Sequence, residues 1–214
     1  MLYVMTAATA GPCQAGAPAA TIQLLFETLP GRCPAFFCMS ESIDVEVRPA
    51  KERDAKVIAE IQAAAAQAAF KAQFPGEAMP EFDSLKKSQA YWREAIEFAD
   101  PQVLVAVADG EVVGFVGFDR SRDPKTPATM GEIWAIYARP SHWGKGVGLA
   151  LWDAARDGLI EEGCTKVSAW VPLAYERALR FHDMAGFKRE MTTIKTVLVG
   201  LTRIEEIRFK RDLK

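Results

Sequence analysis

A glycine-rich turn is the part of this sequence whose residue types and spacing best suit chemistry. The stretch RPSHWGKGVGLALW, residues 139–152, places Gly144, Gly146 and Gly148 two apart and continues into an apolar run. A helix N-terminus exposes about four unpartnered backbone N–H groups and carries a partial positive charge. Because glycine has no Cβ, a phosphate can approach these groups closely. A strand, this turn and a helix therefore predict a phosphate-binding site.

The spacing of the glycines distinguishes this turn from two known phosphate-binding motifs. A P-loop needs G-x-x-x-x-G-K-[ST], and no lysine followed by a hydroxyl residue stands here. A dinucleotide fingerprint needs G-x-G-x-x-G, whereas the third glycine, Gly148, comes one position early, with Leu149 next. Two alternatives stay open: a nucleotide-binding β-α-β protein of different chemistry, and a tight turn that binds no ligand.

The run from Glu132 to Leu151 resembles motif A of the GNAT superfamily of acetyl-coenzyme A-dependent N-acetyltransferases. That motif is a strand, then Q/R-x-x-G-x-G/A, then a helix. Gly146 and Gly148 fall on its two glycine positions. Trp143 stands where the family usually has Gln or Arg, a tolerable departure because backbone N–H groups do most of the binding.

A second stretch, YERALRFHDMAGF from Tyr175 to Phe187, resembles motif B of the same family, usually N-x-x-A-x-x-x-Y-x-x-x-G-F. Ala178, Gly186 and Phe187 match this pattern. Tyr175 replaces the Asn and His182 replaces the Tyr. With the two motifs in the correct order, the resemblance covers residues 43–211.

The resemblance implies acetyl-CoA as co-substrate, no metal, and direct transfer to a primary amine of a small molecule or peptide in a ternary complex. The pyrophosphate would lie on backbone N–H groups of Trp143, Gly144, Lys145, Gly146, Val147, Gly148 and Leu149. Where two strands of the family's sheet splay apart, the pantetheine arm would pair with Ile136, Tyr137 and Ala138. The N–H of Ile136 would also polarise the thioester carbonyl.

Two residues are candidates for moving protons. An amine acceptor has a pKa of about 10 and must lose a proton before it attacks. Glu132, the acidic residue of an apolar strand, resembles the base of some family members, and burial would raise its pKa. The alternative is a solvent-facing residue at the start of the strand. His182 stands where the family has the tyrosine that protonates the leaving thiolate; its alternative is a structural role on the helix.

Two tryptophans, Trp134 and Trp170, lie on the strands next to these candidates. They are expected to pack in the core, with an aromatic wall for the acceptor as the alternative.

The secondary-structure elements that must position these residues follow from hydrophobic period and turn residues. Strands are expected at 43–48, on both sides of Asp109-Gly110, at 131–138 and 165–171, and in a closing hairpin, 187–199 and 203–211, around Gly200. Helices are expected at 50–74, at 84–98 with Ser84 as its cap, at 147–161, and at 174–185. This order predicts an α/β (α+β) fold with a mixed, mostly antiparallel sheet and helices on both faces.

The bulk composition excludes several classes of protein. The chain has 214 residues, half of them hydrophobic, which suits one globular domain. Its net charge of -2 argues against nucleic acid as a partner. No apolar run approaches the roughly 18 residues of a membrane span. The four cysteines match no zinc or disulfide pattern, so we expect a reduced, cytoplasmic protein.

Residues 1–42 differ from the rest of the chain, since residues 1–26 contain no charged side chain. We expect an N-terminal extension outside a domain at 43–214; the alternative is an arm with a short helix at 21–29. A catalytically silent acyl-CoA-binding module remains an alternative function, because the tyrosine of motif B is absent. The family often dimerises, so a homodimer is a further expectation.

Overall fold

The computed structural model describes residues 43–76, 84–199 and 202–213. The expectations for the N-terminal extension and for the turn at Gly200 lie outside these residues. Within them the order of strands and helices follows the order expected from the sequence.

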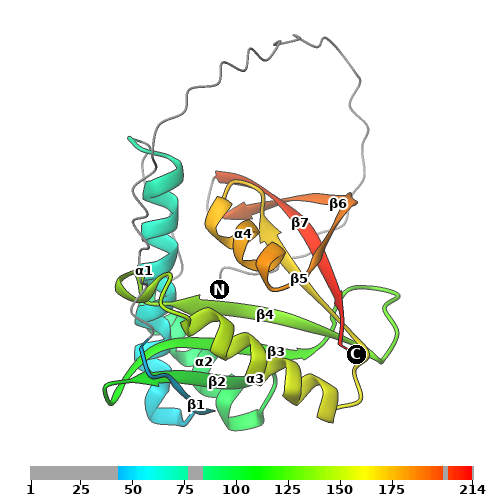
Figure 1. Cartoon of the computed structure of the whole chain (residues 1–214). Coiled ribbons are helices and arrows are strands. Elements are labelled where there is room, and N and C mark those ends of the chain that lie inside the picture. Colours follow the sequence, from blue (N-terminus) through cyan, green and yellow to red (C-terminus); the bar gives the residue numbers. More distant parts are fainter. Residues whose placement is uncertain (1–42, 77–83, 200–201, 214) are drawn as a thin grey trace, which may run out of the picture.

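The described strands form one mixed sheet (Figure 1), with the spatial order β1-β2-β3-β4-β5-β7-β6. β4 and β5 are its parallel pair, and the other neighbours are antiparallel. The predicted mixed, mostly antiparallel sheet is therefore confirmed. The bounds of the strands are Glu46–Pro49 (β1), Gln102–Ala108 (β2), Glu111–Arg120 (β3), Met130–Ala138 (β4), Lys166–Pro172 (β5), Lys188–Val199 (β6) and Thr202–Asp212 (β7).

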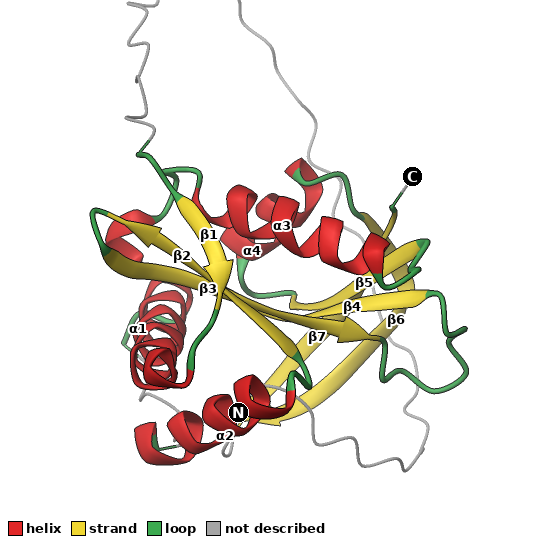
Figure 2. Ribbon diagram, turned by 90° about the horizontal axis from the view of Figure 1, so that it is seen from below, coloured by secondary structure: helices red, strands yellow, loops and turns green. Residues whose placement is uncertain are grey.

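Helices cover both faces of the sheet, as Figure 2 shows. α1 (Ala55–Gln73) and α2 (Leu85–Phe98) pack on one face over β2 and β3. α3 (Val147–Glu161) and α4 (Glu176–Met184) pack on the other face, over the larger of the two cores. The short 3-10 helices η1 (Glu52–Asp54) and η2 (Pro140–His142) precede α1 and α3.

None of the helices in the described part of the chain is long and apolar enough to cross a membrane. In the same ranges, no group of three or more His, Cys, Asp and Glu side chains is arranged to hold a metal ion.

Local signals account for most element boundaries. Asp109 and Gly110 adopt positive φ values of 50° and 78°, which the tight β2–β3 turn requires. Ser84 caps α2, since its Oγ accepts a hydrogen bond of 3.3 Å from the N–H of Lys87. The first strand begins later than expected, at Glu46, because its pairing with β2 starts there.

β4 and β5 part after a short parallel ladder. Their pairing runs from Met130 opposite Lys166 to Ile133 opposite Ala169, and both strands then continue unpaired with each other. On its other side β4 has a bulge against β3, which leaves Trp134 without a partner residue. The bulge shifts the alternation of the strand, so that Ile133 and Ile136, three residues apart, both pack on the α3 core. The splay that the family resemblance implied is present.

A glycine of β3 sets how closely α3 approaches the sheet. A Cβ at Gly114 would lie 2.8 Å from Cγ1 of Val147 and 2.9 Å from the carbonyl oxygen of Tyr137. Gly114→Ala should therefore lower the free energy of unfolding by about 1–3 kcal/mol, because the first turn of α3 must move. Glu111→Ala, at the exposed start of the same strand, should stay within about 0.5 kcal/mol of wild type. Urea titration measures both; equal stabilities would mean that the helix yields without cost.

Candidate active site

The turn between β4 and α3 presents unpartnered backbone donors at the helix N-terminus. Gly144 and Gly146 have φ values of 79° and 88°, and a Cβ at either would meet no atom within 4 Å. Within the described residues, four N–H groups here have no acceptor: those of Gly144, Gly146, Val147 and Gly148. These glycines therefore leave open space directly in front of free donors, an arrangement that fits a phosphate.

The other N–H groups of the predicted binding set are already engaged. The N–H of Trp143 donates to Pro140 at 3.3 Å, that of Lys145 to His142 at 3.4 Å, and that of Leu149 to the carbonyl of Gly146 at 3.0 Å. Of the seven residues expected to bind the pyrophosphate, four therefore keep a free N–H group.

Gly148 has a second reason to be glycine. A Cβ there would lie 3.0 Å from Cε2 of Phe181 on α4, so the residue allows two helices to approach closely. The sequence pattern could not reveal this contact, because Phe181 lies in the following helix.

The edge of β4 beyond the bulge offers backbone groups to a ligand. The N–H of Arg139 donates to Val113 on β3 at 2.8 Å, and strand geometry alternates such groups between the two edges. Tyr137 therefore points its main chain toward β3, whereas Ile136 and Ala138 point theirs toward the side where β5 has departed. Of the three residues predicted to pair with the pantetheine arm, Tyr137 is turned away from it.

Trp143 connects the glycine turn to this edge. Its indole Nε1 donates to the carbonyl of Ala138 at 3.0 Å, so that acceptor is already used. The guanidinium carbon of Arg177 on α4 lies 4.6 Å from the centroid of its indole ring. Trp143, which departs from the family pattern, thus links the glycine turn to β4 on one side and to α4 on the other. Ile136 keeps both its N–H and its carbonyl toward the splay.

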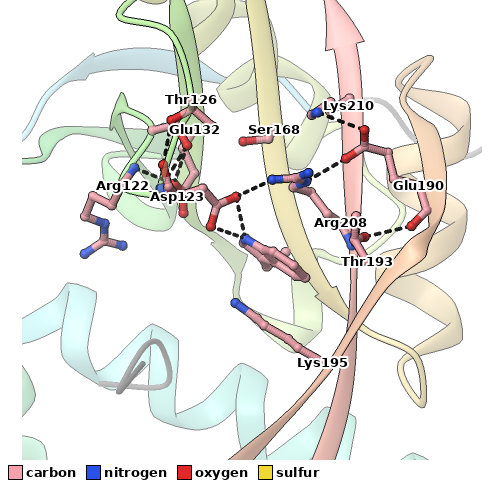
Figure 3. Close-up of polar contacts among 12 residues, drawn as sticks. Arg122, Asp123, Thr126, Glu132, Ser168, Glu190, Thr193, Lys195, Arg208 and Lys210 are labelled. Atoms are coloured by element: carbon pink, nitrogen blue, oxygen red, sulfur yellow. Dashed lines mark hydrogen bonds and ion pairs between the residues drawn. The ribbon is translucent and has the colours of Figure 1, made fainter. Parts of the chain in front are cut away.

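Glu132 lies on the last part of the β4–β5 ladder, opposite Ser168, and faces the side of the sheet that α1 and α2 cover. Its side chain is buried, and its Oε2 accepts hydrogen bonds from the N–H of Arg122 at 3.0 Å and the Oγ of Ser121 at 3.2 Å (Figure 3). Burial raises the pKa of this carboxyl, opposed by these hydrogen bonds and by the charge of Arg122. The alternative of a solvent-facing residue is therefore wrong.

A network of charged side chains surrounds Glu132 on this face. Asp123 accepts from the indole Nε1 of Trp170 at 3.1 Å and from Arg208 at 2.9 Å. Arg208 also donates to Glu190 at 2.6 Å, and Glu190 pairs with Lys210 at 2.8 Å (Figure 3). The sequence pattern does not reveal the charged residues of this network, since Asp123 lies in a polar loop and Arg208 stands 85 residues further on.

Trp134 and Trp170 are the first residues of β4 and β5 beyond the ladder. The guanidinium carbon of Arg122 lies 3.2 Å from the ring centroid of Trp134, and Nζ of Lys195 lies 3.5 Å from that of Trp170. Both rings are only partly buried. Their position at the splay and their cation-covered faces favour the aromatic wall over core packing.

His182 lies in the core between α4 and the sheet. It is 5% exposed, its Nδ1 lies 2.8 Å from the carbonyl of Ala178, and its ring packs against Phe181, Phe187 and Phe209. Burial lowers its pKa to about 4, so the imidazole is neutral at neutral pH. This placement argues against His182 as the proton donor to the thiolate and favours the alternative, a structural role on the helix.

Comparison with known proteins agrees with this geometry. The Acetyltransferase (GNAT) family matches residues 64–187, which is more than half of the chain, and the chain belongs to this family.

Two named relatives share part of the chain. A mycothiol acetyltransferase of Acidimicrobium ferrooxidans is 32% identical over 106 residues, which are 49% of this chain and 34% of that protein. One of Propionibacterium freudenreichii is 31% identical over 117 residues, 54% of this chain and 37% of that protein. The chain thus spans little more than a third of the length of these curated relatives.

Solved structures share the fold. A putative acetyltransferase of Salmonella typhimurium with its cofactor acetyl-CoA has a TM-score of 0.59 and 23% identity, covering 79% of this chain and 94% of that one. An N-acetyltransferase of Staphylococcus aureus has a TM-score of 0.61 and 20% identity, covering 80% and 99%. The predicted GNAT fold is confirmed.

The open turn generates a prediction with a matched control. Gly146→Ala places a methyl group where we expect the pyrophosphate, and should weaken acetyl-CoA binding by about tenfold or more. Gly163→Ala, beyond the other end of α3, has a similar φ of 79° and equally open space, so it imposes the same backbone strain away from the turn. Calorimetry should show wild-type affinity in the Gly163 variant alone; equal weakening in both would contradict a phosphate site at this turn.

The buried imidazole generates a second prediction. The folded-state pKa of His182, about 4, lies below its ordinary 6.5, so protonation favours the unfolded chain and stability falls as pH drops from 6.5 toward 4. His182→Phe should remove this part of the acid sensitivity. Melting temperatures at several pH values in this range measure the effect. The variant should also keep its kcat at neutral pH within about threefold; a loss of about tenfold at unchanged acetyl-CoA affinity would restore the role of proton donor.

Proposed function

We propose that this chain transfers the acetyl group of acetyl-CoA to a primary amine of a small molecule or peptide. The observation that carries the proposal is the parting of β4 and β5 beside the glycine turn. Three features support it: the backbone groups of Ile136 on β4, the free donors of the turn that follows β4, and the buried carboxylate of Glu132 on the same strand. The names of the curated relatives suggest a mycothiol-related amine as one acceptor to test.

In this proposal, backbone groups bind acetyl-CoA and polarise its thioester carbonyl. The N–H groups of Gly144, Gly146, Val147 and Gly148 bind the pyrophosphate, supported by the partial positive charge of α3. The carbonyl and N–H of Ile136 pair with the pantetheine arm as an added strand would. The same N–H stabilises the negative charge that develops on the thioester oxygen during attack.

Glu132 takes one proton from the acceptor ammonium, which frees the lone pair of the nitrogen for attack on the thioester carbon. A carboxyl with a raised pKa is a better match to an amine than an ordinary glutamate, because proton transfer is less uphill. The second proton of the nitrogen passes to the departing sulfur. This route needs no charged imidazole, which accords with the neutral His182.

A second candidate function is a module that binds acyl-CoA without reacting. The absence of the family tyrosine, and the burial of the histidine that replaces it, favour this candidate. A panel of amines and peptides, assayed for release of free CoA, separates the two functions. Release with any acceptor establishes the enzyme; tight acetyl-CoA binding without release from any of them supports the silent module.

Glu132 generates a kinetic prediction. Glu132→Gln keeps the shape of the side chain and removes the base, so kcat/KM should fall by about 10²–10³-fold at neutral pH and recover partly at high pH. Ser121→Ala should leave the base in place but remove a hydrogen bond that stabilises its charged form, so the acidic limb of the pH profile should move to higher pH. A Gln variant within about twofold of wild type would place the base elsewhere.

A further inference from the structure

A lysine of the C-terminal hairpin reaches the point where β4 and β5 part. Lys195 lies on β6, and its Nζ stands 3.5 Å from the ring centroid of Trp170, the first residue of β5 beyond the ladder. Figure 3 shows the side chain extending from its strand toward the face on which Asp123 and Glu132 lie. A primary ammonium of this chain is therefore directed toward the region assigned to the acceptor.

The surroundings of this ammonium are those that an amine acceptor would need. The Oε2 of Glu206 on β7 is 3.8 Å from Nζ of Lys195, and the charges of Asp123 and Glu132 also act on this ammonium. Glu206 is buried, and its Oε2 accepts no hydrogen bond from the described residues. A cation over an aromatic face, with carboxylates around it, is a common way for proteins to bind ammonium groups.

The chemistry of the side chain matches its position. Burial lowers the pKa of Lys195, although the charges of Glu206, Asp123 and Glu132 act in the opposite direction. At a given pH a larger fraction of this amine is therefore unprotonated than for an exposed lysine. The side chain is 28% exposed, so most of it is packed against its neighbours on this face of the sheet.

We propose that Lys195 is an acceptor of the chain's own acetyl transfer, so that the protein acetylates itself there when no other amine is bound. The proposal rests on the function proposed above. Glu132 accepts one proton from the ammonium, and Nζ then attacks the carbonyl carbon of the thioester. The C–N bond forms as the C–S bond breaks, with its electron pair remaining on sulfur. The second proton of the nitrogen passes to that sulfur, which gives acetyl-Lys195 and free CoA.

The product would change the site that made it. An acetylated Lys195 carries no charge, so Glu206 loses its ion-pair partner while its carboxylate stays buried. The acetyl amide would also occupy the face of Trp170 that the ammonium covers now. Acetylation should therefore lower the melting temperature of the protein and hinder the entry of an external amine.

The test uses the full chain with acetyl-CoA and no added amine. Intact mass and peptide mapping should show one acetyl group per chain, at Lys195, and none at this position in Lys195→Arg. Lys188→Arg is the matched control, since Lys188 is an exposed lysine at the start of the same strand, and it should leave the modification unchanged. Glu132→Gln should slow it by about 10²-fold.

Dilution separates reaction within one chain from reaction between chains. An intramolecular step keeps the same fractional rate when the protein is diluted about tenfold at saturating acetyl-CoA. The inference is overturned if Lys195 stays unmodified, reacts no faster than Lys188, or slows in proportion to dilution. An amine panel run in parallel reports on the proposed function. If amines are acetylated and Lys195 is not, the inference alone fails; if Lys195 alone is acetylated, acetyl transfer holds and the external acceptor is in doubt.

Discussion

The loss of pairing between β4 and β5 after Ile133 and Ala169 is the constraint on which the site depends. Unpaired backbone groups inside a sheet are costly unless something else satisfies them. Here the bulge at Trp134 changes which backbone groups of β4 face β3, and the indole of Trp143 donates to the carbonyl of Ala138. The backbone groups of Ile136 remain open toward the splay. The crossover through α3 keeps the two strands parallel while its N-terminus reaches the same opening, so donors and strand edge meet there.

The face opposite α3 carries a balanced set of buried and half-buried charges. Asp123, Arg208, Glu190 and Lys210 form a continuous chain of ion pairs from the β3–β4 loop to the end of β7. Such a network holds side chains in place because each charge has a partner. Glu132 is held by neutral donors instead, so its carboxylate is oriented but remains able to take up a proton.

Burial shifts the pKa values of three titratable groups that bear on the proposed chemistry. The same desolvation raises the pKa of Glu132 and lowers those of His182 and Lys195, because burial disfavours the charged form of every group. For Glu132 and Lys195 the two pKa values therefore move toward each other, which favours the proposed proton transfer between them. For the imidazole it removes the charged form altogether near neutral pH, and the residue becomes part of the core.

The sequence by itself determined the elements and the glycine turn. The Asp109-Gly110 hairpin, the Ser84 cap and the bounds of α3 follow from preferences that act over a few residues, and the structure reproduces them. Only the tertiary structure decided which side chains are buried together. The contact of Gly148 with Phe181, the aromatic cage of His182 and the approach of Lys195 to Trp170 join residues of different elements. Sheet register and helix packing set these distances, and with them the desolvation that decides each pKa, so no local pattern could reveal them.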